Sequence, residues 1–244
     1  MDGILTGFSG MMRGRAISVT DATHITGTIA QVALATASGL TIVRQGVSFS
    51  INTATVGAGG RSTATAIQAS TEYFMHVIDN GTAPSCLLDT SATAPTLPSG
   101  YSYFYCVGSL FTSTGTSGLI AMTFMGKRVK YRVGGANCAN LPIILTGATG
   151  SYTTPTFTAI SLVSTVSSLA MSAGFTARVS NGLMAVCPNN SYGVYNSATN
   201  PPYFYTNNAN TDGAAFEMLL ESTNAYVYSQ AGSLLAVNGW VDDL

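Results

Sequence analysis

The stretch Val47-Ser-Phe-Ser-Ile51 directs three apolar side chains to one face of an extended chain and two hydroxyls to the other. This alternation is typical of a β-strand that is buried on one face only. Eight further runs have strand-like patterns, and clusters of Gly, Asn, Ser and Pro separate them: 40–43, 72–78, 103–111, 119–125, 175–179, 216–220, 225–228 and 234–240. Helical periodicity is nearly absent, so the sequence predicts an all-β fold of antiparallel β-sandwiches.

A length of 244 residues fits two modest β-domains, and a composition break near residues 126–132 places a boundary between them. We predict a first β-sandwich domain over residues 31–132 and a second over residues 133–244, both jelly-roll-like. Residues 1–30 show no stable period, so we expect an extended N-terminal arm that docks on a neighbouring molecule during assembly. A frayed terminus is the alternative.

The surface of the chain must be unusually poor in charge. Only 8% of the residues are charged, against about 25% in a typical soluble protein, whereas Ser and Thr together number 58. We therefore expect much of the exterior to face other copies of the chain in a homo-oligomer, with a trimer favoured. A secreted β-protein with a Thr, Ser, Asn and Gly exterior is the alternative. The net charge of −1 predicts no nucleic-acid partner.

The sequence predicts neither a secretion signal nor insertion into a membrane. Its first fifteen residues lack a basic region before an apolar run, and no uninterrupted apolar run reaches about 18 residues. The cysteines, Cys86, Cys106, Cys138 and Cys187, form no CxxC pair and have no histidine at metal-ligand spacing, so no metal or cofactor is expected. We expect thiols, with one disulfide such as Cys86 to Cys106 as the alternative.

Two consecutive blocks carry a resemblance to a known class of proteins. The first, Glu72-Tyr-Phe-Met-His-Val-Ile-Asp-Asn-Gly81, reads as a strand and a hairpin turn. The second is Leu88-Asp-Thr-Ser-Ala-Thr-Ala-Pro-Thr-Leu-Pro-Ser-Gly-Tyr101, in which two prolines interrupt any ladder before the aromatic strand Tyr103-Phe-Tyr-Cys-Val-Gly108. Over residues 72–131 this order resembles a module of tail fibres, tail appendages and related virion proteins of tailed bacteriophages.

The C-terminal run Leu234-Leu-Ala-Val-Asn-Gly-Trp-Val-Asp-Asp-Leu244 is similar to the closing strands of such proteins. The resemblance implies a virion structural protein, assembled in the host bacterial cytoplasm, that contacts other virion proteins. Within that class it implies a tail fibre or tail appendage that mediates assembly and host attachment. A capsid decoration or head-fibre protein is one alternative, and a capsule-degrading tailspike-type hydrolase is another.

Titratable groups are too few and too scattered to predict an enzyme. His76 lies in a run that is apolar on both faces, which favours a core histidine, and His24 has only Asp21 nearby. Glu217 and Glu221 would share a strand face about 13 Å apart. Glycosidase carboxylates lie roughly 5 to 9.5 Å apart, so this pair does not supply that geometry.

Residues 188–210 are the best candidate for a recognition surface. Tyrosine offers rigid amphipathic area and asparagine offers paired donors and acceptors, a chemistry that suits a host surface glycan or a subunit junction. The residues that we select are Tyr192, Tyr195, Asn196, Tyr203, Tyr205, Asn207 and Asn208.

A basic run supplies the interface candidates Lys127, Arg128, Lys130 and Arg132. In a strand, Arg128, Lys130 and Arg132 would share one face and Lys127 would lie on the other. We expect them to contact an acidic patch on another subunit, with nucleic acid as the alternative.

Overall fold

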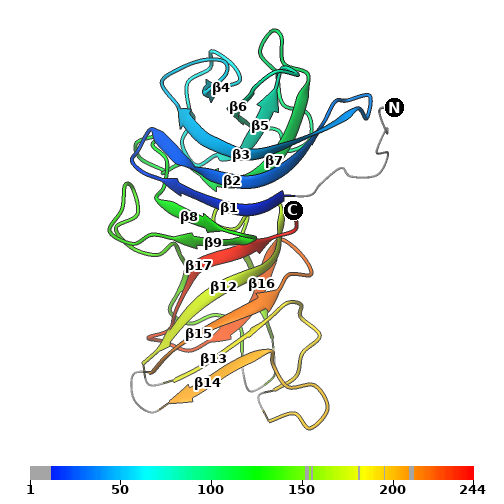
Figure 1. The fold of residues 1–244 in the computed structure, drawn as a ribbon. Helices are drawn as coiled ribbons and strands as arrows, with labels where there is room; N and C mark the ends of the chain where they lie inside the picture. The colour runs from blue at the N-terminus through cyan, green and yellow to red at the C-terminus, as the bar shows by residue number, and fades with distance from the viewer. Residues whose placement is uncertain (1–11, 152–153, 155, 181, 195, 209–211) are drawn as a thin grey trace. The chain divides into compact units, whose positions relative to one another are not determined.

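The computed structural model describes residues 12–151, 154, 156–180, 182–194, 196–208 and 212–244, and these form two compact units (Figure 1). The first unit runs to Ala139 and also contains Asp242–Leu244, and the second unit is Asn140–Val241. The described regular elements are all strands, as the sequence predicts. The predicted boundary fell near residue 132, a few residues before the one observed.

The first unit is built on one mixed sheet in the order β9-β8-β1-β2-β7-β5-β6-β4, and β3 also pairs with β2. Neighbouring strands run antiparallel except for β4 and β6, which are parallel. The strands are β1 Met12–Val19, β2 His24–Ala35, β3 Thr41–Asn52, β4 Gly60–Arg61, β5 Glu72–Asp79, β6 Pro84–Asp89, β7 Tyr103–Phe111, β8 Met122–Met125 and β9 Arg128–Tyr131.

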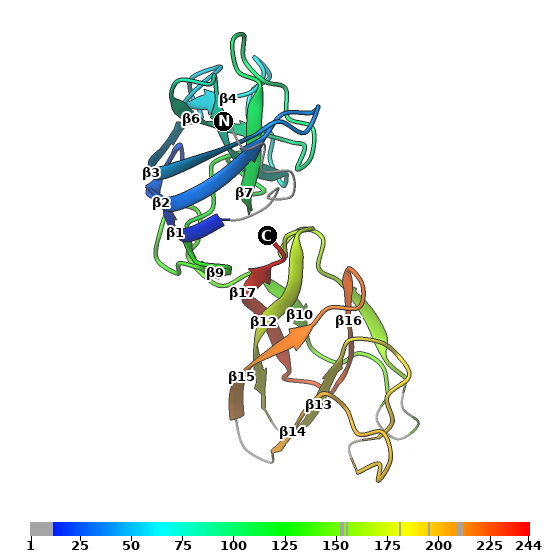
Figure 2. The ribbon, with the colours of Figure 1, turned by 45° about the vertical axis from the view of Figure 1, so that its right-hand side comes forward.

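The second unit contains two sheets (Figure 2). One has the order β15-β12-β17, with β10 also paired to β17, and the other has the order β11-β16-β13-β14. Aromatic rings join them, because Phe204 of β14 stacks on Phe216 of β15 at 4.0 Å between centroids, and Phe216 contacts Phe175 of β12 at 5.3 Å. The strands are β10 Ile143–Thr146, β11 Thr158–Ser161, β12 Ala170–Val179, β13 Gly182–Cys187, β14 Phe204–Asn208, β15 Asp212–Leu219, β16 Asn224–Ser229 and β17 Leu234–Asp242.

The run that indicates the fold lies in β3, where Val47, Phe49 and Ile51 are buried and the residues between them are exposed. The sequence suggested separate strands at 40–43 and 47–51, but the structure joins them into one strand of 12 residues. Gly46 permits this with a φ of 61°, and the register with β2 is the same on both sides of it, with Gln31↔Gln45 before it and Ile29↔Val47 after it.

The block 88–101 is organised by a buried carboxylate and a buried imidazole. Asp89, only 5% exposed, accepts hydrogen bonds from the amides of Ser91 at 2.7 Å and Thr96 at 2.9 Å. His76 is fully buried in β5, and its Nε2 donates to the Ser91 carbonyl at 2.9 Å. The loop before β7 is therefore fixed to the sheet although its prolines cannot donate to a ladder.

The prediction of an extended arm over residues 1–30 is wrong from residue 12 onward. There the chain forms β1 and the beginning of β2, and β1 pairs with both β2 and β8. Residues 1–11 lie outside the described part. The pattern was obscured because Arg15 occupies a buried position in line with Ile17 and Val19, so the apolar alternation looks broken in the sequence.

Arg15 is held by partners from three distant parts of the first unit, although its Nη2 has no hydrogen-bond partner among the described residues. Its Nη1 lies 2.8 Å from Asp242 Oδ2 and donates to the Val107 carbonyl at 2.5 Å, while Nε donates to the Gly126 carbonyl at 2.7 Å. Both charged side chains are 0% exposed. Gly108 leaves room for them, because a Cβ there would lie 2.5 Å from Arg15 Nη1.

We predict that this ion pair holds β1 in the sheet. Asp242→Ala should lower the free energy of unfolding of the first unit by roughly 3 to 5 kcal/mol, because it leaves a buried guanidinium without its counter-ion. The double variant Arg15→Met/Asp242→Leu should regain much of the loss. Urea denaturation checks this, with Arg13→Ala, at an exposed position of the same strand, as the matched control. A loss below about 1 kcal/mol in Asp242→Ala would contradict the prediction.

The buried His76 predicts a pH dependence. Burial lowers its pKa below the ordinary value of 6.5, against opposing contributions from the Ser91 carbonyl and Asp89. The folded state therefore binds fewer protons than the unfolded state, so the stability is fully present above pH 6.5 and is lost as the pH falls below it. The slope contributed by this group can reach about 1.4 kcal/mol per pH unit. Denaturation at a series of pH values should show a shallower slope for His76→Gln, and equal slopes would refute the assignment.

Candidate functional site

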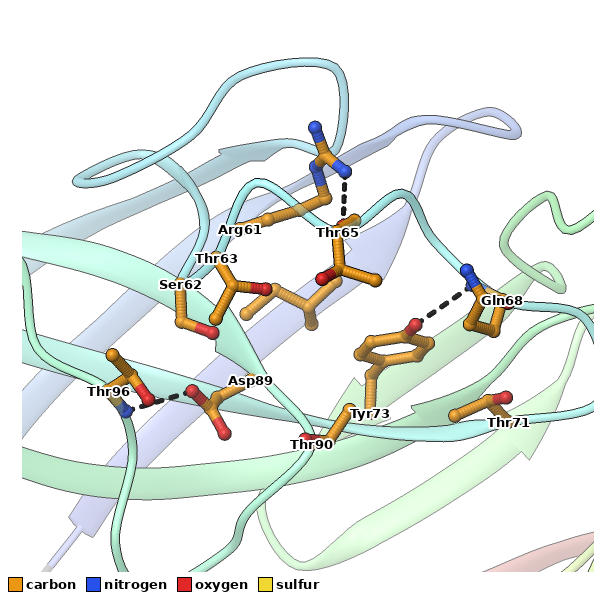
Figure 3. A pocket seen from close by; sticks show the side chains of 11 residues that line it. Arg61, Ser62, Thr63, Thr65, Gln68, Thr71, Tyr73, Asp89, Thr90 and Thr96 are labelled. Carbon is orange, nitrogen blue, oxygen red and sulfur yellow. Dashed lines mark hydrogen bonds between the residues drawn. The ribbon is translucent and has the colours of Figure 1, made fainter.

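A cavity of about 210 Å³ lies in the first unit, between the segment after β4 and the segment after β6 (Figure 3). We call it the Arg61 pocket. Hydroxyl groups make up most of its polar lining, and one guanidinium, one carboxylate and one amide complete it. Its lining residues are Arg61, Ser62, Thr63, Thr65, Gln68, Thr71, Tyr73, Leu88, Asp89, Thr90 and Thr96.

Backbone hydrogen bonds fix the walls of the Arg61 pocket. The parallel pairing of β4 with β6 places Arg61 opposite Leu88, next to Asp89. Asp89 accepts a hydrogen bond from the main-chain amide of Thr96, and the Tyr73 hydroxyl accepts one from the main-chain amide of Gln68 at 2.9 Å. Tyr73 is only 6% exposed, so its ring is a fixed part of the lining. The pocket is thus preorganised, which lowers the entropic cost of binding a ligand.

The guanidinium of Arg61 is held in place but has no acidic partner among the described residues. Its Nη1 donates to the Thr65 carbonyl at 2.5 Å, and its Nε is buried with no hydrogen-bond acceptor in the described part of the chain. Arg44 offers a contrast within the same unit. There Nε and Nη2 hold the two oxygens of the buried Asp79 at 2.7 and 2.9 Å.

A second, larger hollow of about 600 Å³ also has Arg61 in its wall. Alanine and isoleucine side chains line part of it, and a hydrogen-bonded turn lines another part. The turn is fixed by Asn137, whose amide donates to the Leu119 carbonyl at 3.0 Å and whose oxygen accepts from Thr116 at 3.1 Å. The other lining residues are Ala22, Thr23, Thr53, Ala54, Ala66, Ile67, Ser117 and Gly118.

The structure divides the tyrosine-rich segment 188–210 into a loop and a strand. Residues from Phe204 form β14, which pairs antiparallel with β13 so that Tyr205 lies opposite Ala185. The expected exposed loop therefore ends before β14. Tyr195 lies outside the described residues, and so do the side chains of Asn207 and Asn208.

The described tyrosines of this segment are attached to the second unit by different means. Tyr203 is 50% exposed, and its hydroxyl donates to the Glu217 carbonyl at 3.0 Å. Tyr192 is half-buried, and burial raises the pKa of its phenol, with smaller contributions from nearby groups that include Tyr203. Asn196 is exposed in the same loop. Either receptor contact or subunit contact stays a prediction for these residues.

The four basic residues predicted as an interface occupy the β8–β9 hairpin and its end. Lys127 lies in the turn, and Arg128 and Lys130 alternate on β9 with buried residues. Arg132 follows the strand and its Nη2 donates to the Val19 carbonyl at 2.6 Å. The outward face therefore carries Arg128, Lys130 and Arg132, as the spacing indicates, and the partner of this face stays a prediction.

The titratable groups considered for catalysis are not among the lining residues of the Arg61 pocket. His24 Nδ1 lies 2.9 Å from Asp21 Oδ2 on an exposed turn. Glu217 accepts from Ser172 within the β12–β15 pair, whereas Glu221 lies beyond β15 and accepts from Asn189.

The cysteines that the structure describes are buried, free thiols. Burial raises the pKa of Cys86, Cys106 and Cys187 to about 12, so these three remain thiols near neutral pH. Among the described residues, no group of His, Cys, Asp and Glu has the arrangement to hold a metal ion. No helix in the described part is long and apolar enough to cross a membrane.

Sequence reasoning did not select the Arg61 pocket. The run Arg61-Ser-Thr-Ala-Thr65 has no strand period, and its only signal is a guanidinium beside several hydroxyls. Asp89 lies within residues 88–101, where the sequence signal comes from the prolines and not from this carboxylate. Comparison with known protein families, curated proteins and solved structures finds no match.

Proposed function

We propose that the chain is a structural component of a tailed-phage particle, part of a tail fibre or tail appendage. It associates with copies of itself, a trimer being favoured, and with other virion proteins. It attaches the particle to the host surface, where a surface glycan is the candidate receptor, after assembly in the bacterial cytoplasm. Each unit would serve as a jelly-roll-like β-sandwich, and the Phe204–Phe216–Phe175 stack between two sheets supports this for the second unit.

The observation that carries this proposal is the low charge of the exterior. The chain has nine basic and ten acidic residues, and three of these charges, on Arg15, Asp242 and Asp79, are fully buried in ion pairs. Hydroxyl and apolar surface costs less to desolvate than charged surface, which favours permanent contacts with other chains. Exposed apolar side chains occur on both units: Leu40, Val43, Val56, Met125, Val133, Ile143, Val163, Met171, Tyr203 and Leu219.

We predict that the purified protein is an oligomer and that it is found on the tail of the phage particle. Light scattering should give a multiple of the chain mass of 25.1 kDa, threefold for the favoured trimer. Antibodies against the protein should label tails in electron micrographs. Labelled heads would instead support a capsid decoration or head-fibre protein. A dispersed monomer at high concentration, together with unlabelled particles, would refute the proposal.

We also predict that Tyr203 contributes to attachment. Tyr203→Ala removes an aromatic surface that is half exposed, so adsorption of particles to host cells should fall by tenfold or more while the particles still assemble. Tyr101→Ala, a truncation of the same size in the first unit, is the matched control. Full adsorption by both variants would exclude Tyr203 as a receptor contact. A failure of Tyr203→Ala particles to assemble would identify the tyrosine as a subunit contact.

A further inference from the structure

We propose that the Arg61 pocket binds an acidic saccharide, a sugar ring that carries a carboxylate, and that Arg61 holds the carboxylate. This inference rests on the attachment role proposed above and names the class of ligand. The pocket lies wholly in the first unit, so it is separate from the tyrosine-rich segment of the second.

The charge of Arg61 supports a carboxylate as the ligand group. The Nη1 bond to the Thr65 carbonyl fixes the plane of the guanidinium, and the edge formed by Nε and Nη2 has no acceptor among the described residues. Arg44 uses that same edge to hold both oxygens of Asp79. A buried donor such as Arg61 Nε is costly when it has no acceptor, and a bidentate carboxylate would satisfy it.

The rest of the lining matches a sugar ring. Figure 3 shows the side chains of Thr63, Thr65 and Gln68 around the same hollow as the Tyr73 ring. Hydroxyls both donate and accept hydrogen bonds, as sugar hydroxyls require, and an aromatic ring can face the C–H surface of a sugar. A volume of about 210 Å³ is below the roughly 300 to 1,000 Å³ of pockets for drug-sized ligands. It is therefore suited to one ring rather than to a large ligand.

Arg61 also belongs to the lining of the larger hollow, together with the apolar side chains of Ala66 and Ile67. An oligosaccharide with its carboxylate at Arg61 would therefore have a second hollow beside the same guanidinium for a neighbouring ring.

The test measures binding of trigalacturonate and of its methyl ester to the full chain by isothermal titration calorimetry. The two probes have the same rings, and only the first carries free carboxylates. We expect trigalacturonate to bind at least tenfold more tightly, with an affinity that falls as salt is added. Equal affinity for the two probes, or no binding of either, overturns the inference.

Variants assign the binding to the pocket. Arg61→Gln removes the charge and should weaken trigalacturonate binding at least tenfold. Arg178→Gln, at an exposed arginine on β12 of the second unit, is the matched control and should bind as the wild type does. Thr63→Phe fills the pocket from an exposed position and keeps Arg61, so it should also abolish binding.

The circular dichroism spectrum of each variant must match that of the wild type. Unchanged binding by Arg61→Gln and Thr63→Phe would exclude this site. That outcome would not decide whether the protein is part of the phage tail, because antibody labelling of particles tests this separately.

Discussion

The buried pair of Arg15 and Asp242 is the constraint on which the rest of the first unit depends. A guanidinium without exposure must find both a counter-ion and hydrogen-bond acceptors, and here they come from Asp242, Val107 and Gly126. The ring of Phe124 adds a further contact, 5.2 Å from the guanidinium carbon. Strand β1 is thereby fixed between β2 and β8, and the sheet that carries the Arg61 pocket extends from it.

The alternation of apolar and polar residues was sufficient to predict an all-β fold, because a strand that is buried on one face shows this alternation within a few residues. Val47, Phe49 and Ile51 show it directly, and β3 contains them. The signal failed for β1, where Arg15 stands at a core position and its partner is 227 residues away in the chain. No local pattern can reveal such a partner, so an extended arm was predicted where the structure has a central strand.

The candidate site was harder to predict than the fold for a related reason. The Arg61 pocket depends on β4, a strand of two residues, and on its parallel pairing with β6. Two residues carry no period, and parallel pairing joins segments that no hairpin connects. The tyrosine-rich segment was visible from composition alone, but composition could not show that Tyr205 belongs to a strand. The residue types therefore indicated which side chains are suited to binding, whereas the pairing of distant strands determines which of them lie together in a pocket.

The return of the chain to the first unit has a consequence for its biosynthesis. Domains usually fold in the order in which the ribosome makes them. The second unit is continuous from Asn140 to Val241, so all of its residues are available before the first unit receives Asp242. Until translation reaches that residue, the nascent first unit lacks the counter-ion of Arg15. The unit that begins first is therefore completed last, and the later segment can reach its native state while still tethered to an unfinished neighbour.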